Sequence, residues 1–336
     1  MNWYLQSGKE SDVAISTRIR FSRNINGYSF NLSSDELESL ENKIKESIYE
    51  IGYGLKYLRI KDMDEITKIS LLEKNLVTEE FLNKNQDKKS ILINDEENIC
   101  IMIGEEDHLK IQVYSAGLEL ENTLNLAIEL DKKIEEVLGY CVSKKYGYLT
   151  AYPSNLGTGL KASVMLHLPA LQKTNNIKKV LQVISNFGVE IKGISSKEGN
   201  LIGDIYQISN KQTLGLTEEE IAKNIKVIAE KIIKNERQAR KYLANEGIDL
   251  EDEIYRSFGI FTNCKKITEE ETLELLSNIK LGVDLGILRE VTDLQVQSLY
   301  LYTKPANMQK KLGETLGKIE QDVKRAEIIK QIFKEK

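Results

Sequence analysis

Residues 99–114 read ICIMIGEEDHLKIQVY. Two apolar runs, residues 99–103 and 109–114, flank a short polar segment that starts at Gly104 and carries three consecutive acids. Two β-prone runs joined by a short glycine-containing segment predict a β-hairpin. Hairpin strands pair antiparallel, so we expect an antiparallel sheet with a cluster of acids at one of its turns.

The elements predicted around this hairpin mix strands and helices. Residues 34–50, which follow Ser33 as a possible cap, and residues 119–138 place apolar side chains at helical spacing. The other predicted elements are strands at 90–94, 147–152, 189–194 and 202–209, and a helix at 174–187. No regular βαβ rhythm is present, which favours an α+β fold with a largely antiparallel sheet flanked by helices over a doubly wound fold.

The end of the chain has a different pattern, which is helical almost throughout. The predicted helices cover residues 217–245, 249–258, 269–284, 293–303 and 318–334. Asn245-Glu246-Gly247 is the best candidate boundary. We therefore expect two domains, a catalytic domain at 1–245 and an all-helical domain at 246–336, each long enough to bury its own core.

Composition excludes several classes of protein. The net charge of −5 argues against a nucleic-acid binder that relies on bulk positive charge. No apolar run reaches the ~18 residues of a membrane span, and the N-terminus lacks the apolar stretch of a secretory signal. Three widely spaced cysteines argue against a disulfide framework or a zinc site. We expect a cytoplasmic protein that binds neither membranes nor nucleic acid.

Arg18 and Arg20 lie in the segment STRIR, residues 16–20. If this segment is extended, both side chains project from one face because side chains alternate along a strand. Two forked guanidinium groups suit a polyphosphate, whose oxygens can accept parallel hydrogen bonds. A solvated basic edge strand is the alternative interpretation.

Two further segments are candidates for chemistry. In GEEDHLK, residues 104–110, the acids could orient a cationic substrate and accept a proton, although acids are common in turns for solubility alone. The loop PSNLGTGLK, residues 153–161, is similar to a phosphate cradle but matches neither GxxxxGK(S/T) nor GxGxxG. Taken singly, each motif is weak.

Together and in this order, STRIR, EEDHLK and YPSNLGTGLKASVMLHLPAL resemble the ATP:guanido phosphotransferases, the phosphagen kinases. Members read S-(S/T)-R-(I/V)-R, N-E-E-D-H-(L/I)-R and C-P-(S/T)-N-(L/V)-G-T-G-(L/M)-R. The later segment QISNKQTLG, residues 207–215, and the helical C-terminal region narrow the resemblance to the bacterial protein-arginine kinases. The resemblance covers essentially the whole chain.

The resemblance implies in-line transfer of the γ-phosphoryl group of ATP, with Mg²⁺, to a guanidinium nitrogen. Glu106, with Glu105 beside it, matches the carboxylates that hold the guanidinium group and take its proton. Lys197 stands where these kinases have a further carboxylate, and Glu198 could serve if the loop slips by one residue. No metal site made by the protein itself is predicted. The nucleotide-binding positions implied by the resemblance are Ser16, Thr17, Arg18, Ile19, Arg20, Asn75, Lys110, Lys161, Ala162, Ser163, Val164, Met165, Lys192, Gly193, Ile194, Ser195, Ser196 and Lys197.

Several of these positions depart from the family pattern. Lys110, Lys161 and Lys192 fall where arginines are usual, which keeps the charge but loses the bidentate fork. Asn75 stands where a histidine that contacts the nucleotide is common, and Tyr152 replaces the cysteine before Pro153. A bulky tyrosine there could narrow the guanidinium pocket.

The C-terminal region departs from the family in the same way. The protein-arginine kinases carry R-D-x-x-R-A near their end, a pocket that binds phosphoarginine and couples product to activation. Here the positions are Gln321, Asp322, Arg325 and Ala326. Because glutamine cannot pair bidentately with a phosphate, we expect phosphoarginine sensing to be weakened or lost.

The leading hypothesis is a protein-arginine kinase that marks proteins for a chaperone-protease in protein quality control and the stress response. By resemblance its partners are protein substrates with exposed arginines, a zinc-binding activator, an AAA+ chaperone-protease and a second copy of the chain. The apolar residues at 281–288 could form that dimer surface or helical core.

The alternative is a degenerate pseudokinase that acts as a binding or adaptor protein. A kinase for free amino acids is less favoured, because STRIR begins at Ser16 and leaves no room for the N-terminal helical domain of such enzymes.

Overall fold

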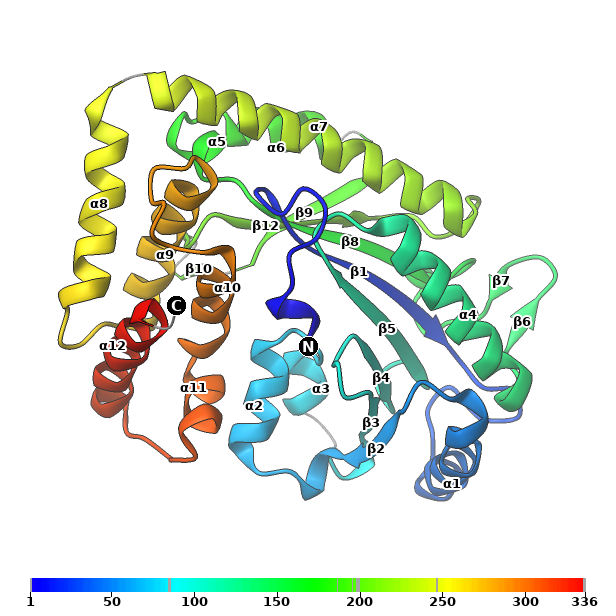
Figure 1. Ribbon diagram of the computed structural model, residues 1–336. Coiled ribbons are helices and arrows are strands. Elements are labelled where there is room, and N and C mark those ends of the chain that lie inside the picture. Colours follow the sequence, from blue (N-terminus) through cyan, green and yellow to red (C-terminus); the bar gives the residue numbers. More distant parts are fainter. Residues whose placement is uncertain are drawn as a thin grey trace.

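The computed structural model describes residues 2–83, 86–185, 187–194, 196–197, 200–245 and 247–334. An eight-stranded sheet forms its centre, with the strand order β2-β3-β4-β5-β1-β8-β12-β9 (Figure 1). In chain order these strands are β1 (Ala14–Arg23), β2 (Lys56–Arg59), β3 (Ser90–Ile93), β4 (Ile99–Ile103), β5 (Leu109–Ala116), β8 (Leu160–His167), β9 (Val189–Gly193) and β12 (Ile205–Asn210). All seven neighbouring pairs are antiparallel, which confirms the predicted fold class.

The predicted hairpin is confirmed as β4 and β5. Ile103 pairs with Leu109 across the turn, and the backbone N–H of Gly104 donates to the carbonyl of His108 at 3.1 Å. Gly104 has a φ of +83°, and a Cβ there would meet the carbonyl oxygen of Lys88 at 2.5 Å. Glycine is therefore required where the acidic turn begins.

Among the described residues up to Asn245, the chain also contains seven helices and some short elements. The helices are α1 (Ser34–Ile51), α2 (Glu65–Glu73), α3 (Glu79–Asn83), α4 (Leu120–Leu138), α5 (Pro169–Lys173), α6 (Ile177–Ser185) and α7 (Glu218–Asn245). The short strands are β6 (Val142–Ser143), β7 (Gly147–Tyr148), β10 (Ser196–Lys197) and β11 (Asn200–Leu201), and the 3₁₀ turns are η1 (Trp3–Leu5), η2 (Ile60–Asp62), η3 (Gln86–Lys88) and η4 (Pro153–Asn155).

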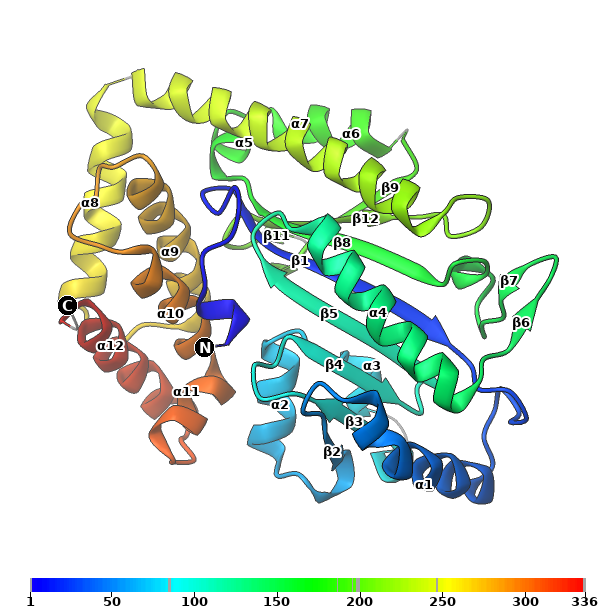
Figure 2. The same cartoon turned by 45° about the vertical axis from the view of Figure 1, so that its right-hand side comes forward.

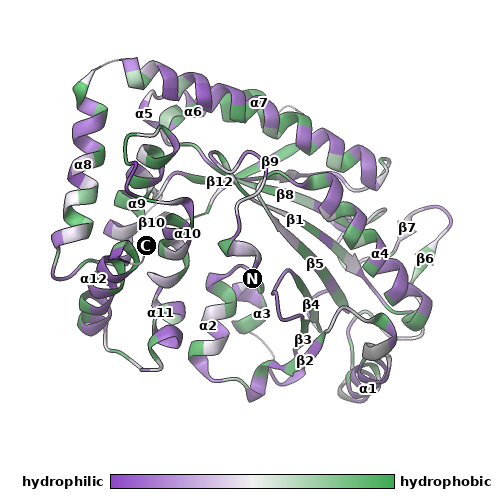
Figure 3. Cartoon of the chain, in the orientation of Figure 1, coloured by the Kyte–Doolittle hydropathy of each residue, from purple (hydrophilic) through white to green (hydrophobic). Residues whose placement is uncertain are grey.

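One face of the sheet is covered by α4 and α7, which lie over the strands in Figure 2. Ile19 and Phe21 of β1 are buried in this layer together with Leu124 and Ile134 of α4. Hydrophobic residues follow the strands in Figure 3 and alternate with hydrophilic ones along α4 and α7, as expected of helices with one buried face. Burial of these apolar side chains stabilises the layer.

The opposite face of the sheet is divided into two parts. Over β3, β4 and β5, the elements η1, α2 and α3 cover a second buried cluster that includes Phe81, Met102 and Tyr114. Over β1, β8, β12 and β9, the residues that point to this face are largely polar. This polar part contains the candidate site.

The C-terminal region is helical, as predicted. Its helices are α8 (Ile248–Asn263), α9 (Glu269–Asp284), α10 (Asp293–Tyr302), α11 (Pro305–Leu312) and α12 (Lys318–Lys334). They enclose a cluster of their own, in which Leu281 and Leu288 are buried. Core packing therefore accounts for these two residues, and the domain boundary at 245/246 and the dimer stay predictions.

Some element boundaries differ from the predictions. The strand predicted at 147–152 is wrong beyond Tyr148, because the backbone N–H of Ala151 donates to the Asp107 carboxylate at 2.7 Å instead of to a strand. The strand predicted at 202–209 starts at Ile205, since Gly203 and Asp204 form a turn with positive φ. No helix in the described part of the chain is long and apolar enough to cross a lipid bilayer.

Candidate active site

Arg18 and Arg20 point to the polar face of β1, as predicted. They alternate with Ile19 and Phe21, which are buried on the helix-covered face. The Nε atoms of both arginines are buried, and neither has a hydrogen-bond partner among the described residues. Burial, followed by the charge of Arg18, lowers the pKa of Arg20. Because buried donors without a partner cost stability, this pair of guanidinium groups is suited to an anion.

Lys161 and Lys192 lie on further strands of the sheet and, with Arg18 and Arg20, form a row of cations on its polar face, the cationic row. Lys161 of β8 lies opposite Arg20, and Lys192 belongs to β9. Glu190, also on β9, accepts from Lys161 at 2.8 Å and lies 3.0 Å from the Nζ of Lys192. The hydrogen bond from Lys161 is the main reason that the pKa of Glu190 falls to about 2. Both lysines therefore share an internal carboxylate that the sequence analysis missed.

The acidic turn brings two carboxylates to the same face. The Nζ of Lys110 lies 2.6 Å from an oxygen of Glu105 and is also ion-paired with Glu106. The hydroxyl of Thr78 donates to the other oxygen of Glu105 at 2.9 Å. Glu80 of α3 offers a third carboxylate, since oxygens of Glu80, Glu105 and Glu106 lie within 4.8 Å of one another. This carboxylate cluster could hold a guanidinium group or a divalent cation.

Glu106 has the protonation state that a guanidinium partner requires. Burial alone would raise its pKa, but the hydrogen bond and charge of Lys110 outweigh burial and lower it. The carboxylate is therefore ionised at neutral pH. It can accept hydrogen bonds from a cation and then a proton.

Asp107 and His108, the other two residues of the motif, hold the turn in place. Buried Asp107 accepts from the Asn24 side chain at 2.8 Å and from the backbone of Ala151. The Nδ1 of His108 accepts from the backbone N–H of Ile25 at 3.0 Å, so its Nε2 carries the proton and donates to Ser29 at 2.8 Å. Burial lowers the pKa of His108, which keeps the ring neutral. These contacts give Asp107 and His108 a structural role, so Glu105 and Glu106 remain the candidates for chemistry in this motif.

The glycine loop at 153–159 is fixed by the later motif around Thr213. The backbone N–H of Thr158 donates to the carbonyl of Thr213 at 3.1 Å, and the Thr213 hydroxyl donates to Leu156 at 2.6 Å. Buried Arg23 donates to the carbonyl of Thr158 at 2.8 Å and pairs with Asp131 at 2.6 Å. Arg23 therefore supports the loop and does not belong to the cationic row. The loop leads directly into β8 and Lys161.

At the other end of the polar face lies a cavity of about 150 Å³. Four of the predicted nucleotide residues line it: Ser16, Asn75, Met165 and Ile194. Asn75 follows α2 with a φ of +59°, and its carbonyl accepts from the hydroxyl of Tyr114 at 2.7 Å. The structure thus brings these positions together from four separate segments.

Other predicted positions do not reach this face with their side chains. Thr17, Ile19, Ala162 and Val164 are fully buried against the helix-covered side, because they occupy the alternate positions of β1 and β8. Ser163 is on the polar side of β8, and Gly193 ends β9. Ser196 and Lys197 form β10, whereas Ser195 and Glu198 lie outside the described residues, so the predicted role of Glu198 stays a prediction.

The predicted phosphoarginine residues lie on α12, far along the chain from the acidic turn. Arg325 is buried and donates to the carbonyls of Thr303 and Ile267, both at 2.8 Å, and to Asp322 at 2.7 Å. Gln321 donates to the carbonyl of Leu316, and Ala326 is buried. Arg325 thus joins α12 to the segments before α9 and after α10. The expected weakening or loss of phosphoarginine sensing stays a prediction.

Sequence reasoning missed Thr78, Glu80 and Glu190. Glu190 could have been found, because it precedes Lys192 by two residues on a predicted strand and so shares its face. Thr78 and Glu80 approach the acidic turn only through the packing of α3 beneath β4 and β5. No local pattern indicated that contact.

Two family models match the chain. Residues 37–239 match the ATP:guanido phosphotransferase C-terminal catalytic domain, and residues 247–336 match the protein-arginine kinase McsB C-terminal domain. Among curated proteins, the protein-arginine kinase of Halothermothrix orenii is 43% identical over 98% of this chain and 95% of its own length. The protein-arginine kinase of Clostridium acetobutylicum is 37% identical over 98% of each chain.

Solved structures have the same fold. A lombricine kinase superimposes with a TM-score of 0.58 at 24% identity, over 72% of this chain and 70% of its own. The duplicated taurocyamine kinase of Schistosoma mansoni, with bound transition-state analogue components, has a TM-score of 0.59 at 26% identity. That match covers 67% of this chain and 33% of the larger one.

Proposed function

Because the chain belongs to the protein-arginine kinases of the ATP:guanido phosphotransferase family, we propose that it transfers the γ-phosphoryl group of ATP to arginine side chains of proteins. The observation that carries the proposal is the shared sheet face of Glu105, Glu106 and the cationic row. Carboxylates suited to a guanidinium group lie beside cations suited to a polyphosphate. Donor and acceptor can therefore meet on one surface.

Glu105 and Glu106 act on the arginine substrate during phosphoryl transfer. A guanidinium group has a pKa above about 12 and is a poor nucleophile until a base removes a proton. Glu105 and Glu106 bind the cation, and Glu106 takes the proton from the attacking nitrogen. A nitrogen–phosphorus bond forms as the bond between the γ-phosphorus and its bridging oxygen breaks, and that oxygen leaves on ADP with the electron pair.

The cationic row stabilises the charge on the nucleotide and on the group in transit. Arg18 and Arg20 donate to phosphate oxygens, and Lys110, Lys161 and Lys192 add charge from β5, β8 and β9. Mg²⁺, which we expect to arrive with ATP, would neutralise further phosphate charge. Because Glu105 and Glu106 are ion-paired with Lys110, which lies opposite Ser22 of β1, we expect the γ-phosphoryl group at that end of the strand.

Family membership also supports proposals about the surroundings of the reaction. We expect substrates to be proteins with exposed arginines that are thereby marked for a chaperone-protease in the cytoplasm. A zinc-binding activator, an AAA+ partner and a homodimer are the corresponding proposals for partners. A non-transferring adaptor is the second candidate function, because Lys110 occupies both carboxylates that an arginine must use.

The deciding experiment incubates the purified protein with Mg-ATP and unfolded casein and detects phosphoarginine by mass spectrometry without acid treatment. Phosphate on arginine supports the kinase. Glu106→Gln should reduce transfer by about 10²–10⁴-fold while ATP affinity stays nearly unchanged, because only the base is lost. An active relative serves as the positive control. ATP binding without phosphoarginine would favour the adaptor, and equal loss of binding and transfer in the variant would refute the role of Glu106.

A further inference from the structure

Three exposed apolar side chains lie around the acidic turn and the glycine loop. Phe30, Tyr152 and Leu214, here called the apolar rim, have exposed fractions of 45%, 51% and 52%. They come from three separate segments, which are the loop after β1, the residue before η4 and the loop after β12. Single exposed apolar residues are common on protein surfaces, but a group gathered around one site marks an interaction surface.

Hydrogen bonds place the two aromatic members of the rim beside the acidic turn. The residue before Phe30 accepts a hydrogen bond at its carbonyl from the Nε2 of His108 at 2.8 Å. The residue before Tyr152 donates its backbone N–H to the carboxylate of Asp107 at 2.7 Å. Each aromatic residue is therefore the direct neighbour of a residue that contacts the motif of Glu106.

Leu214 continues the rim along the glycine loop. The hydroxyl of Thr213, the residue before it, donates to the carbonyl of Ser154 at 3.0 Å. A Cβ on Gly157 would lie 2.9 Å from the Cα of Leu214, so the two backbones are packed closely together. The rim thus runs from the acidic turn, past Tyr152, along the glycine loop.

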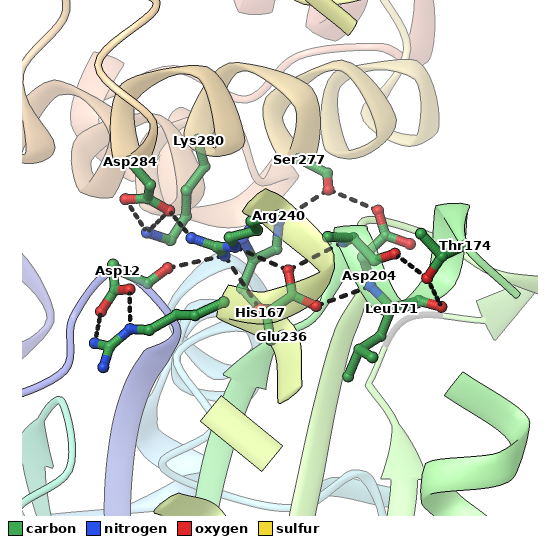
Figure 4. Close-up of polar contacts among 12 residues, drawn as sticks. Asp12, His167, Leu171, Thr174, Asp204, Glu236, Arg240, Ser277, Lys280 and Asp284 are labelled. Atoms are coloured by element: carbon green, nitrogen blue, oxygen red, sulfur yellow. Dashed lines mark hydrogen bonds and ion pairs between the residues drawn. The ribbon is translucent and has the colours of Figure 1, made fainter. Parts of the chain in front are cut away.

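The opposite end of the sheet is covered by the C-terminal helix α9 (Figure 4). At the end of β8, the Nε2 of His167 lies 2.9 Å from the hydroxyl of Ser277 of α9. Buried Arg240 of α7 donates to Asp284 of α9 at 3.2 Å and to Glu236 of its own helix at 2.8 Å. These contacts hold α9 against the strand ends. A long polypeptide therefore has more room at the acidic end of the sheet, where the rim lies.

The proposed substrate indicates what would occupy the rim. A protein that offers an arginine to Glu105 and Glu106 also brings the residues before and after that arginine. An extended chain advances about 3.3 Å per residue, so neighbours up to three positions away lie within about 10 Å of the arginine. Aromatic side chains provide large contact areas at protein interfaces. Apolar neighbours of the arginine would remove the rim from water, whereas polar neighbours would leave it hydrated.

We propose that the apolar rim binds apolar side chains next to the target arginine and so directs the kinase to arginines in apolar segments. The inference rests on the proposed function and adds a sequence preference to it. Glu105 and Glu106 recognise the guanidinium group, which is the same in every arginine. Phe30, Tyr152 and Leu214 distinguish one arginine from another by its neighbours.

The test measures the binding of two labelled peptides to the full chain by fluorescence anisotropy in the presence of ADP. The peptides have equal length and charge, and their single arginine is flanked by leucine and phenylalanine in one and by serine in the other. Wild type should bind the apolar-flanked peptide about tenfold more tightly. Tyr152→Ser should remove most of that preference and leave the affinity for the serine-flanked peptide unchanged. Phe30→Ser and Leu214→Ser should each remove a smaller part.

Two controls accompany this measurement. Tyr242→Ser, on α7, replaces a tyrosine with an exposed fraction of 57% and should leave the preference intact. A third peptide has the apolar flanks but alanine in place of arginine. It should bind about tenfold more weakly than the apolar-flanked arginine peptide, because it lacks the charged hydrogen bonds to the carboxylates.

Equal binding of the two arginine peptides by wild type, or a preference that survives Tyr152→Ser, would overturn the proposal. Equal binding of the alanine peptide would show general adhesion of apolar peptides and would overturn it as well. Failure of the kinase proposal is distinguishable. A preference that depends on Tyr152 without phosphoarginine formation has the rim without the activity, and phosphoarginine formed equally on both arginine peptides has the activity without the rim.

Discussion

The cations of the site fall into two groups that differ in their partners. Arg18 and Arg20 on β1 each have a buried Nε without a partner among the described residues. Lys110, Lys161 and Lys192 are all ion-paired, the first with Glu105 and Glu106 and the other two with Glu190. The arginine pair therefore has donors available for an anion, whereas each lysine must first break an ion pair with a carboxylate before it can bind one.

This difference follows from the chemistry of the two side chains. The planar arginine fork presents several donors in fixed directions, and a lone carboxylate satisfies only some of them. The compact ammonium group of lysine is readily held by a neighbouring acid on the same face. We therefore expect ATP to bind first at the arginines and then to draw the lysines from their carboxylates. Departure of Lys110 would free Glu105 and Glu106 for the incoming arginine.

The largest effect is expected at the arginine pair. Arg20→Ala should lower the rate of arginine phosphorylation by about 10²–10³-fold. The substitution removes a hydrogen-bond donor that is already in place for the phosphates, and no other described residue supplies that donor. Arg20→Lys should recover only part of that loss, since charge returns without the fork. Steady-state kinetics with casein provide the measurement. Arg256→Ala, on the exposed side of α8, is the control that should leave the rate unchanged. Full recovery with lysine would remove the distinction between the two groups.

The next effect concerns Lys110 as an internal competitor for the carboxylates. Lys110→Met should let the ATP-free protein bind an arginine-containing peptide about tenfold more tightly, because the buried ammonium group no longer occupies Glu105 and Glu106. In wild type, by contrast, peptide affinity should rise when ADP is added. Peptide binding is measured by fluorescence anisotropy with and without ADP. The idea fails if wild-type peptide affinity does not respond to nucleotide.

A smaller effect is expected at Glu190. Glu190→Gln removes the carboxylate that Lys161 and Lys192 share, so ATP affinity should rise about two- to fivefold, in line with the value of a partly exposed ion pair. Glu121→Gln, which breaks the exposed pair with Lys226, is the matched control and should leave ATP affinity unchanged. Weaker ATP binding in Glu190→Gln would mean that Glu190 positions the lysines for the nucleotide and does not compete with it.

The sequence predicted the arrangement of the two arginines better than the partners of the lysines. The alternation in STRIR placed Arg18 and Arg20 on one face correctly, because period-two alternation is a local property of a strand. The acidic turn was equally local. The carboxylate that Lys161 and Lys192 share was missed, although Glu190 lies two residues before Lys192 on the same strand face. Glu80 was missed because it reaches Glu105 and Glu106 only through the packing of α3. The residues of the apolar rim come from segments far apart in the chain, and only tertiary structure brings them together.

The smallest expected effect is the pH dependence of the stability that Glu190 contributes through its ion pairs with Lys161 and Lys192. The lysines keep the pKa of Glu190 near 2, against 4.5 for an unperturbed glutamate, chiefly through the hydrogen bond from Lys161. A carboxylate whose pKa is lowered by folding contributes stability above its unfolded pKa, and that contribution is lost as pH falls towards the folded value. The difference in Tm between wild type and Glu190→Gln should therefore be fully present at pH 7 and shrink below about pH 4.5, towards 2. Differential scanning fluorimetry at pH 7, 4 and 3 measures it, with Glu121→Gln for comparison. A difference that grows as pH falls would show that Glu190 is not held as an anion by the lysines, and the contrast with the open arginine pair would disappear.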